Sequence, residues 1–349
     1  MIQTAIIGFG KMGQIRAKAI ENSSIGQIKY VFDPHNNGLK STYTIAESYE
    51  QILADQEVTA IFLCLANYLN KEYTIKALRA GKDVFCEKPP AFNAKEVQEI
   101  ILAEQQSGKK LMYGFNHRQH GAVIKMKEEE DSGKLGKVLW MRGRYGKSVD
   151  KNFYNCWRSK KDLAGGGILL DQGIHMLDLF LHFAQNFDEV NAFVSNLYWK
   201  LDGIEDNVFA IMRNNQTGVV ASLHSTMTQW RHLFSLEIFL EKGYMVLNGL
   251  KTSSNTYGKE ELTIARNRST APAATWDDED KILYEIDSSW QNEVDSFFNT
   301  IINNSPIVSG SSQDSLNVMQ LIDRIYENET LMNKTLHEDL QITVDNKNN

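Results

Sequence analysis

The chain has 349 residues, more than one hydrophobic core usually serves, so we expect two domains. Its 42% hydrophobic and 23% charged residues are typical of a globular protein, and a net charge of −7 without a basic stripe predicts no nucleic-acid partner. Cys64, Cys86 and Cys156 lack a CxxC spacing and no apolar stretch could span a membrane, so we expect no disulfide framework, no metal and no membrane contact. A first strand that begins by Thr4 leaves no room for a leader peptide, which predicts a cytoplasmic protein.

The first predicted element is a short strand, Ala5–Gly8, that runs into a glycine-rich loop. The loop has the pattern G-x-G-x-x-G and consists of Gly8, Phe9, Gly10, Lys11, Met12 and Gly13. In a dinucleotide fold the first glycine permits a tight turn, the second lets the backbone approach a pyrophosphate, and the third lets the next helix pack on the strand. The pyrophosphate then lies at the positive end of that helix, here Met12–Ile20. The alternative is a glycine turn in another kind of α/β sheet.

A second apolar strand, Ile28–Phe32, ends at Asp33, twenty-five positions after Gly8. A carboxylate at this place accepts hydrogen bonds from the adenosine ribose hydroxyls and repels a 2′-phosphate. Pro34 and His35 follow, and neither Arg nor Lys stands directly beside Asp33 to hold such a phosphate. The sequence therefore predicts NAD as the cofactor, with NADP less favoured.

The rest of the first domain, residues 1–120, continues the alternation of strand and helix. We expect strands at Ala60–Leu65, Asp83–Cys86 and Leu111–Phe115 and helices at Tyr49–Leu53, Lys71–Ala80 and Ala94–Gln106. The strands are continuous apolar runs, which favours parallel strands covered on both faces in a doubly wound Rossmann sheet. Ligands bind outside the carboxyl ends of such strands, and the cofactor contacts predicted there are Leu65, Asn67, Glu87 and Asn116.

A lysine stands at the end of the strand Asp83–Cys86, in the segment Glu87-Lys88-Pro89-Pro90. Lys88 is expected to reach the crevice where a nicotinamide lies, where it could contact the cofactor, donate a hydrogen bond to a substrate oxygen and stabilise developing alkoxide charge. The alternative is a solvated lysine before a proline turn. Arg118, three positions past the next strand, emerges at the same crevice and is a predicted substrate contact.

The second domain, residues 121–335, is expected to be α/β with a large open sheet. After a helix at Ala122–Glu130, strands are predicted at Val138–Tyr145, Val190–Leu197, Asn207–Met212, Gly218–Ser225, Phe234–Leu240 and Gly243–Leu247. Their hairpin spacing favours a mostly antiparallel sheet that binds substrate and forms oligomers. The polar segment Thr252–Asp280 is expected to be irregular, followed by helices at Ser289–Ile302 and Ser312–Met332 and a polar tail, residues 336–349, disordered at its end.

A glycine triplet, residues 165–167, precedes a predicted helix that carries Asp171 and His175 four positions apart. On one helix face the carboxylate could orient the imidazole and raise its basicity, as a general base requires. Asp178 and His182 continue the spacing, but the apolar residues between them favour packing over a metal site. Trp157 and Arg158 precede the triplet and are predicted substrate contacts, because an aromatic face and a guanidinium suit a polyol or a phosphate-bearing sugar.

Together these motifs resemble the family of glucose-fructose oxidoreductase, inositol dehydrogenase and the MocA proteins. GFGKMG matches the family's loop, CEKPP its EKP motif, and WRSKKDLAGGGILLDQGIHMLD its substrate loop and GGG-x3-D-x3-H motif. The chain departs from the family at Pro90, where an aliphatic residue is usual, and at residues 65–68, which lack a proline often found there.

The resemblance implies an NAD-dependent oxidoreductase acting on a secondary hydroxyl of a sugar, nucleotide sugar or cyclitol, and a homodimer or homotetramer. In some members the histidine, here His175, is the acid/base while Asp171 orients it and binds substrate; in others the lysine, here Lys88, has this role. The sequence leaves both assignments open. It also leaves open an NAD-retaining, redox-neutral glycosidase and a non-catalytic sensor, although Lys88, Asp171 and His175 together argue against a sensor.

Overall fold

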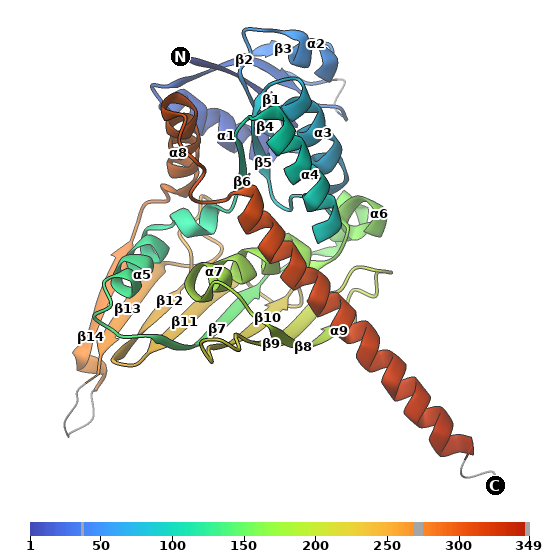
Figure 1. Ribbon diagram of the computed structural model, residues 1–349, viewed down its shortest axis with the longest axis vertical. Coiled ribbons are helices and arrows are strands. Elements are labelled where there is room, and N and C mark those ends of the chain that lie inside the picture. The colour runs from blue at the N-terminus through green and yellow to red at the C-terminus, as the bar shows by residue number, and fades with distance from the viewer. Residues whose placement is uncertain (36–37, 268–274, 346–349) are drawn as a thin grey trace.

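The computed structural model describes residues 1–35, 38–267 and 275–345, with the side chains of the last helix described as far as residue 328. Two layered units lie against each other, a Rossmann domain and a domain built on a larger sheet (Figure 1). Helices from the end of the chain, α8 (Ser289–Asn303) and α9 (Ser312–Asp345), contact the first unit although they follow the second in sequence.

The first domain contains a six-stranded parallel sheet, which confirms the predicted doubly wound fold. Its strand order is β3-β2-β1-β4-β5-β6, so the chain winds outward from β1 in both directions. The strands are β1 (Ile2–Ile7), β2 (Gly26–Phe32), β3 (Thr44–Ile45), β4 (Ala60–Leu63), β5 (Asp83–Glu87) and β6 (Leu111–Gly114). The helices are α1 (Lys11–Asn22), α2 (Tyr49–Ala54), α3 (Asn67–Arg79) and α4 (Ala94–Ser107). Every residue of β4 and β5 is buried, as continuous apolar runs between two helical layers require.

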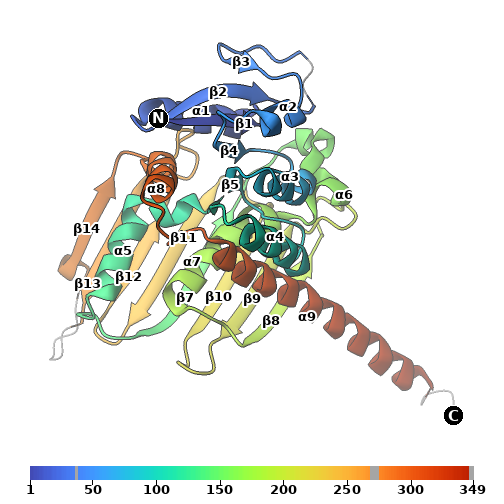
Figure 2. The same cartoon turned by 45° about the horizontal axis from the view of Figure 1, so that its top comes forward.

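The second domain contains an eight-stranded mixed sheet in the order β14-β13-β12-β11-β7-β10-β9-β8. Only β7 and β10 pair in parallel, so the predicted, mostly antiparallel sheet is confirmed. Its strands are β7 (Val138–Gly146), β8 (Glu189–Ser195), β9 (Asn207–Arg213), β10 (Val220–Thr226), β11 (Leu233–Leu240), β12 (Gly243–Asn248), β13 (Glu260–Arg266) and β14 (Glu279–Tyr284). Helices α5 (Gly121–Asp131) and α7 (Ile174–Ala184) lie over one face of this sheet (Figure 2).

The segment Thr252–Asp280, expected to be irregular, holds β13 and the start of β14, so this prediction was wrong. Both strands begin with charged residues that mask their alternation. Glu260, the first residue of β13, is buried because its carboxylate contacts His120 Nδ1 at 2.7 Å and accepts a hydrogen bond from the backbone N–H of Ala122 at 3.0 Å. Residues 268–274 of the same segment lie outside the described residues.

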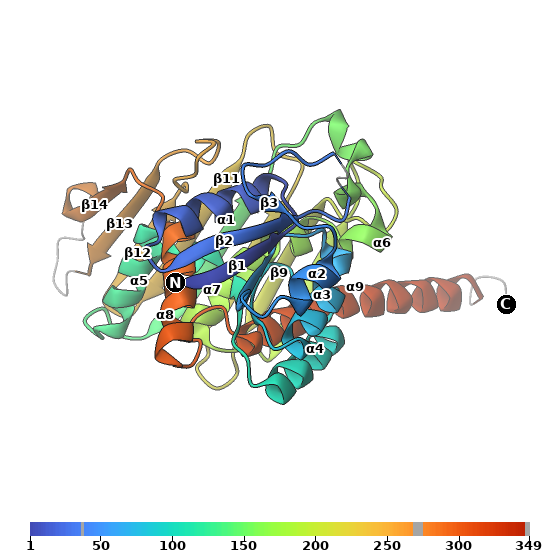
Figure 3. The same cartoon turned by 90° about the horizontal axis from the view of Figure 1, so that it is seen from above.

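Helix α9 continues to Asp345 instead of ending near Met332, so most of the expected polar tail is helical. No glycine or proline occurs between residues 312 and 349, and the sequence thus lacks the usual signals that end a helix. The C-terminal half of α9 extends away from both domains (Figure 3). Residues 346–349 lie outside the described part of the chain.

Helix α8 completes the core of the first domain. Phe297 and Phe298 are fully buried and pack edge-on against Phe62 of β4, with ring centroids 5.6 and 5.8 Å apart. The Gly26 position in β2 has no room for a side chain, because a Cβ there would lie 2.3 Å from the Phe298 ring. Residue 120, the predicted domain boundary, lies between β6 of the first sheet and β7 of the second. Helix α8 follows the second sheet in the chain but packs on the first domain.

A buried ionic cluster joins α8 to the first domain. The Arg16 guanidinium of α1 donates hydrogen bonds of 2.7 Å to Glu87 Oε1 at the end of β5 and to Glu293 Oε2 of α8. The Arg16 side chain is fully buried between the rings of Phe85 and Trp290. Burial outweighs the attraction of Arg16 and raises the pKa of Glu293 to about 8. One arginine thus holds three elements, through the carboxylate of Glu87 and the carboxyl group of Glu293.

The raised pKa of Glu293 predicts a pH-dependent stability. Between an unfolded pKa near 4.5 and a folded pKa of about 8, only the unfolded state has lost the proton, so stability falls as pH rises through this range. Relative to Glu293→Gln, the free energy of unfolding of the natural chain should fall by up to about 1.4 kcal/mol per pH unit in urea titrations. Glu285→Gln, at an exposed carboxylate, should leave this slope unchanged. A pH-independent difference between the natural chain and Glu293→Gln would contradict the prediction.

Candidate active site

The candidate site lies between the two domains, at the carboxyl ends of the parallel strands. A pocket there is lined by Asn67 of the first domain and, among others, by Lys147, Arg158, Ile168 and Asp171 of the second. This is the place where open α/β sheets bind ligands.

The glycine loop has the geometry of a nucleotide cradle. Gly8 has φ +87°, and a Cβ on it would lie 2.4 Å from the Cys64 carbonyl oxygen. A Cβ on Gly13 would lie 2.2 Å from the Gly8 carbonyl oxygen, so only glycine lets α1 pack this closely on the turn. A Cβ on Gly10 would meet nothing within 4 Å, and Gly10 precedes α1 without a side-chain cap on its free N–H groups. Open space before an uncapped helix N-terminus fits a pyrophosphate.

Asp33 lies directly beside this loop. Its Oδ2 accepts a hydrogen bond from the Phe9 N–H at 2.9 Å, and its Oδ1 accepts one from the His35 N–H at 3.0 Å. Each carboxylate oxygen keeps further acceptor capacity, so the position suits the predicted contact with ribose hydroxyls. The loop and Asp33 together fit an adenine dinucleotide. Lys11 begins α1, and Met12 follows it in the first turn.

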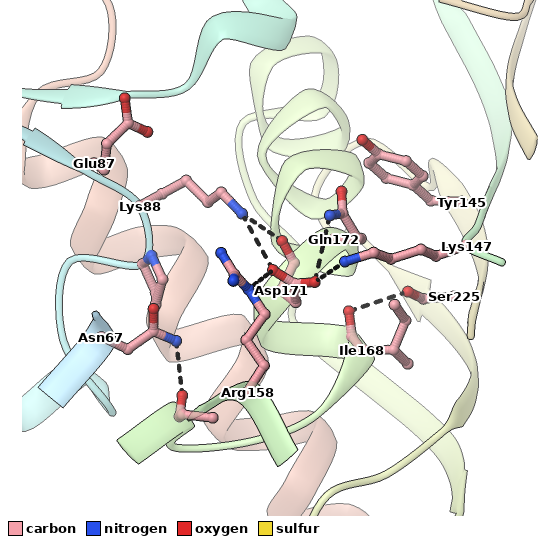
Figure 4. Close-up of polar contacts among 12 residues, drawn as sticks. Asn67, Glu87, Lys88, Tyr145, Lys147, Arg158, Ile168, Asp171, Gln172 and Ser225 are labelled. Carbon is pink, nitrogen blue, oxygen red and sulfur yellow. Dashed lines mark hydrogen bonds and ion pairs between the residues drawn. The ribbon is translucent and has the colours of Figure 1, made fainter. Parts of the chain in front are cut away.

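Lys88 follows β5 and points across the cleft to the second domain. Its ammonium donates a hydrogen bond to the backbone carbonyl of Asp171 and lies 3.9 Å from Asp171 Oδ1 (Figure 4). Burial lowers the pKa of Lys88, while Asp171 opposes this shift. The backbone directly after Lys88 is held by Asn70 of α3, whose amide donates to the Pro89 carbonyl at 2.8 Å. The sequence predicted Lys88 at the crevice, but no motif indicated Asn70.

Asp171 lies in a π-helical turn, Leu169–Gly173, and not in the regular helix that was expected. Its carboxylate contacts Lys147 Nζ at 2.8 Å and Arg158 Nε at 3.3 Å (Figure 4). Burial works to raise the pKa of Asp171, but Lys147, Arg158 and Lys88 hold it well below its ordinary value. The expected pairing of Asp171 with His175 is therefore replaced by an ion-pair cluster.

Lys147, the residue directly after β7, was not predicted from the sequence. The alternating strand that ends before it could have placed it at the sheet edge, but a single lysine there carries no motif. The π-helical turn opposite is supported by Glu205, also missed. Glu205 is buried and accepts hydrogen bonds from the N–H groups of Gly167 and Leu169 at 2.7 and 2.9 Å. A Cβ on Gly167 would lie 2.1 Å from the Glu205 backbone, which explains the third glycine of the triplet.

His175 is buried at the start of α7 and stacks on His117, with ring centroids 3.9 Å apart. Its Nδ1 has no hydrogen-bond partner among the described residues. Burial lowers the pKa of His175 well below its ordinary value, and His117 and Lys88 lower it further. The ring is therefore uncharged at neutral pH. His117 itself is held by Asn116 Oδ1 at 3.1 Å and by the Tyr145 hydroxyl at 3.0 Å.

Three predicted ligand contacts are engaged within the protein instead. The Arg118 guanidinium donates hydrogen bonds of 2.8 and 2.6 Å to the buried Asp178 carboxylate and also contacts Asp314 at 3.2 Å. The Asn116 amide donates to Ser289 Oγ at 3.2 Å. Glu87 is paired with Arg16 and is turned away from the cluster around Asp171 (Figure 4). Successive residues at the end of a strand point to opposite faces, so Glu87 is directed away from the cleft that Lys88 faces.

The other predicted contacts lie at the cleft. The Asn67 amide donates to the Ala164 carbonyl at 2.8 Å and so links α3 to α6 (Lys161–Ala164), the short helix before the glycine triplet. Leu65 is half-buried beside Gly8, whose Cβ would lie 3.3 Å from the Leu65 side chain. The Arg158 guanidinium lies over the Trp157 ring, 4.3 Å from its centroid.

Within the described residues, no three His, Cys, Asp or Glu side chains come together as a metal site. No helix in the described part of the chain combines the length and the apolar character needed to cross a membrane.

Two family models cover both domains. Residues 2–115 match the oxidoreductase family with an NAD-binding Rossmann fold, and residues 123–246 match the C-terminal domain of the GFO/IDH/MocA family. The chain therefore belongs to the Gfo/Idh/MocA family of oxidoreductases, as its motifs predicted.

Several of the matched relatives are named as sugar dehydrogenases or reductases. 1,5-Anhydro-D-fructose reductase of Ensifer adhaerens is 31% identical over 196 residues, which is 55% of this chain and 56% of that protein. Levoglucosan dehydrogenase of Pseudarthrobacter phenanthrenivorans is 32% identical over 149 residues, 42% of this chain and 38% of that protein. The chain thus spans about half the length or less of these relatives. A levoglucosan dehydrogenase structure with NADH and levoglucosan superposes with a TM-score of 0.81 and 22% identity over 94% of this chain and 97% of that one, which shows the shared fold.

The loop geometry predicts separate effects for two glycines. Gly10→Ala should fold normally but weaken NADH binding at least about tenfold, because the new methyl group enters the space open to the pyrophosphate. Gly13→Ala should lower the free energy of unfolding by about 2 kcal/mol, because its Cβ meets the Gly8 carbonyl. Thermal unfolding and NADH fluorescence titration measure the two effects. Normal NADH affinity of Gly10→Ala would place the pyrophosphate elsewhere.

Proposed function

We propose that this protein is an NAD-dependent oxidoreductase that transfers a hydride between the nicotinamide and a secondary hydroxyl or ketone of a sugar or cyclitol. The observation that carries the proposal is the position of Lys88, whose ammonium crosses from the nucleotide-binding domain to Asp171 in the pocket between the domains. Membership of an oxidoreductase family and the sugar dehydrogenases among its relatives support it.

The cofactor would be held by the glycine loop and Asp33. Its nicotinamide supplies the hydride acceptor or donor when bound. The Asp33 carboxylate beside the loop favours NAD over NADP, because a 2′-phosphate would lie next to a negative charge. Lys11 would add positive charge near the phosphates.

We assign to Lys88 the role of acid/base, which accepts or donates the proton of the reacting hydroxyl. A lysine with a lowered pKa can take up this proton as the alcohol is oxidised and return it in reduction. Asp171 keeps the Lys88 side chain extended into the cleft through its backbone carbonyl. His175 is a weaker candidate for the proton, because a histidine whose pKa is lowered well below its ordinary value is a poor base at neutral pH. Asp171, which could have raised its basicity, is engaged with cations instead. We assign to His175 a hydrogen bond to the substrate through its neutral ring.

The test is NADH absorbance with purified protein, NAD or NADP, and a panel of sugars and cyclitols. The natural chain should reduce NAD with at least one of these substrates. Lys88→Met should retain NADH binding and lose turnover at least about a hundredfold. Lys151→Met, at an exposed lysine, should match the natural chain. Near-normal turnover of Lys88→Met would remove Lys88 from the chemistry, and cleavage of glycosides without net NADH would replace the proposal by the redox-neutral alternative.

We further propose that the chain forms a homo-oligomer through one face of the large sheet, the face opposite to α5 and α7. Phe193 of β8 and Phe209 and Ile211 of β9 are 50–66% exposed on this face. Phe209 stacks on His224, and Trp140 stacks on Phe239, each pair with ring centroids 4.0 Å apart. Exposed apolar side chains gathered on one sheet face are typical of a self-complementary interface.

The double variant Phe209→Lys/Ile211→Lys should be monomeric at concentrations where the natural chain sediments as a dimer or tetramer. A charged pair on each copy would be buried against its equivalent, which costs free energy of association. Leu102→Lys, at an apolar side chain of α4 with 57% exposure, serves as the control and should leave the assembly intact. A monomeric natural chain at micromolar concentration would refute the proposed interface.

A further inference from the structure

The candidate pocket contains more positive than negative charge. Lys88, Lys147 and Arg158 all lie within 4 Å of the single carboxylate of Asp171. Glu87, the nearest acidic neighbour in sequence to Lys88, is paired with the buried Arg16 and does not contribute to this balance. One carboxylate neutralises one of the three cations, so the cluster retains about two positive charges while Lys88 is protonated and about one when Lys88 is the neutral proton acceptor.

This local excess contrasts with the chain as a whole, whose net charge is −7. The positive field extends beyond the cluster, because the pKa of His232 is lowered by burial and then by Lys147 and Lys11. Cations that are partly withdrawn from water and share one counterion are poorly compensated. Such a site gains free energy when an anion enters.

The three cations are also arranged to receive a ligand. The Lys147 and Arg158 side chains are 23% and 41% exposed, so each can turn donors toward the pocket. The Arg158 guanidinium lies over the Trp157 ring, 4.3 Å from its centroid, and this contact reduces the conformational entropy that Arg158 loses when it binds an anion. Arginine offers two parallel donors to a carboxylate or phosphate, and lysine adds a point charge.

We propose that this cluster is an anion subsite and that the substrate is an anionic sugar, with a carboxylate or phosphate group close to the carbon that reacts. Because Lys88 belongs to the same cluster, Lys147 and Arg158 would bind the anionic group within a few ångströms of the oxygen that Lys88 contacts. This geometry favours a compact sugar acid or sugar phosphate over a nucleotide sugar, whose diphosphate would lie further away. The inference rests on the proposed function for the role of Lys88.

The experiment is calorimetric titration of the NADH-saturated protein with matched ligand pairs. The pairs are methyl β-D-glucuronide with methyl β-D-glucoside, the corresponding galacto pair, and glucose 6-phosphate with glucose, and UDP-glucose is titrated alone. At least one compact anion should bind about tenfold or more tightly than its neutral partner, and added salt should reduce this preference. Comparison of the carboxylate pairs with the phosphate pair shows which of the two anionic groups the subsite prefers.

Two variants assign the preference to the cluster. Lys147→Gln and Arg158→Gln should each reduce the preference for the anion at least about threefold, whereas Lys151→Gln, at an exposed lysine, should leave it unchanged. The inference is overturned if no pair shows a preference, if only UDP-glucose binds, or if the preference persists in both cluster variants.

Turnover separates this inference from the proposed function. Tighter binding of an anion without hydride transfer to NAD by any member of the panel would leave the anion subsite standing and overturn the oxidoreductase proposal. Oxidation of neutral sugars without any preference for anions would support the oxidoreductase proposal and overturn the anion subsite.

Discussion

The carboxylate of Asp171 is the interaction on which the candidate site depends. It joins a lysine of the first domain to a lysine and an arginine of the second, in a pocket where these side chains are partly withdrawn from water. Without it three like charges would face one another with no counterion between them, which destabilises their arrangement. Its place in the π-helical turn is fixed in turn by Glu205, which holds the backbone of Gly167 and Leu169. The geometry of the candidate site therefore follows from how one irregular turn is supported.

Much of the fold could be predicted from the sequence, because local patterns determine it. Continuous apolar runs predicted the parallel strands, and the glycine spacing predicted the turn before α1. The candidate site was predicted only in part. Lys88 and Asp171 lie in motifs with distinctive spacing, but the partners of Asp171 depend on contacts between segments far apart in the chain. Lys147 and Glu205 carry no local signal, and the expected i, i+4 pairing of Asp171 with His175 assumed a regular helix that tertiary packing replaced with a π-helical turn.

The same limit explains why Arg118 was assigned to a ligand. Arg118 follows β6, and residues at the carboxyl end of this strand are expected near the cleft. The 3-10 turn at residues 116–119 instead directs its guanidinium toward Asp178 on α7. Asp178 was expected to be a structural residue, and it is, as the buried counterion of Arg118. Charges that satisfy one another inside the protein and charges left for a ligand look alike in a sequence. Only their three-dimensional pairing separates them.

Helix α8 returns to the first domain after the chain has completed the second sheet. Arg16 donates a hydrogen bond to it and the phenylalanine cluster around Phe62 packs on it, so the connection is both polar and apolar. The next helix, α9, contacts α4 and β6 of the first domain and also α7 and β8 of the second. A rotation of one domain against the other would shift α9 against one of its two surfaces, so every change in the width of the cleft costs contacts along this helix.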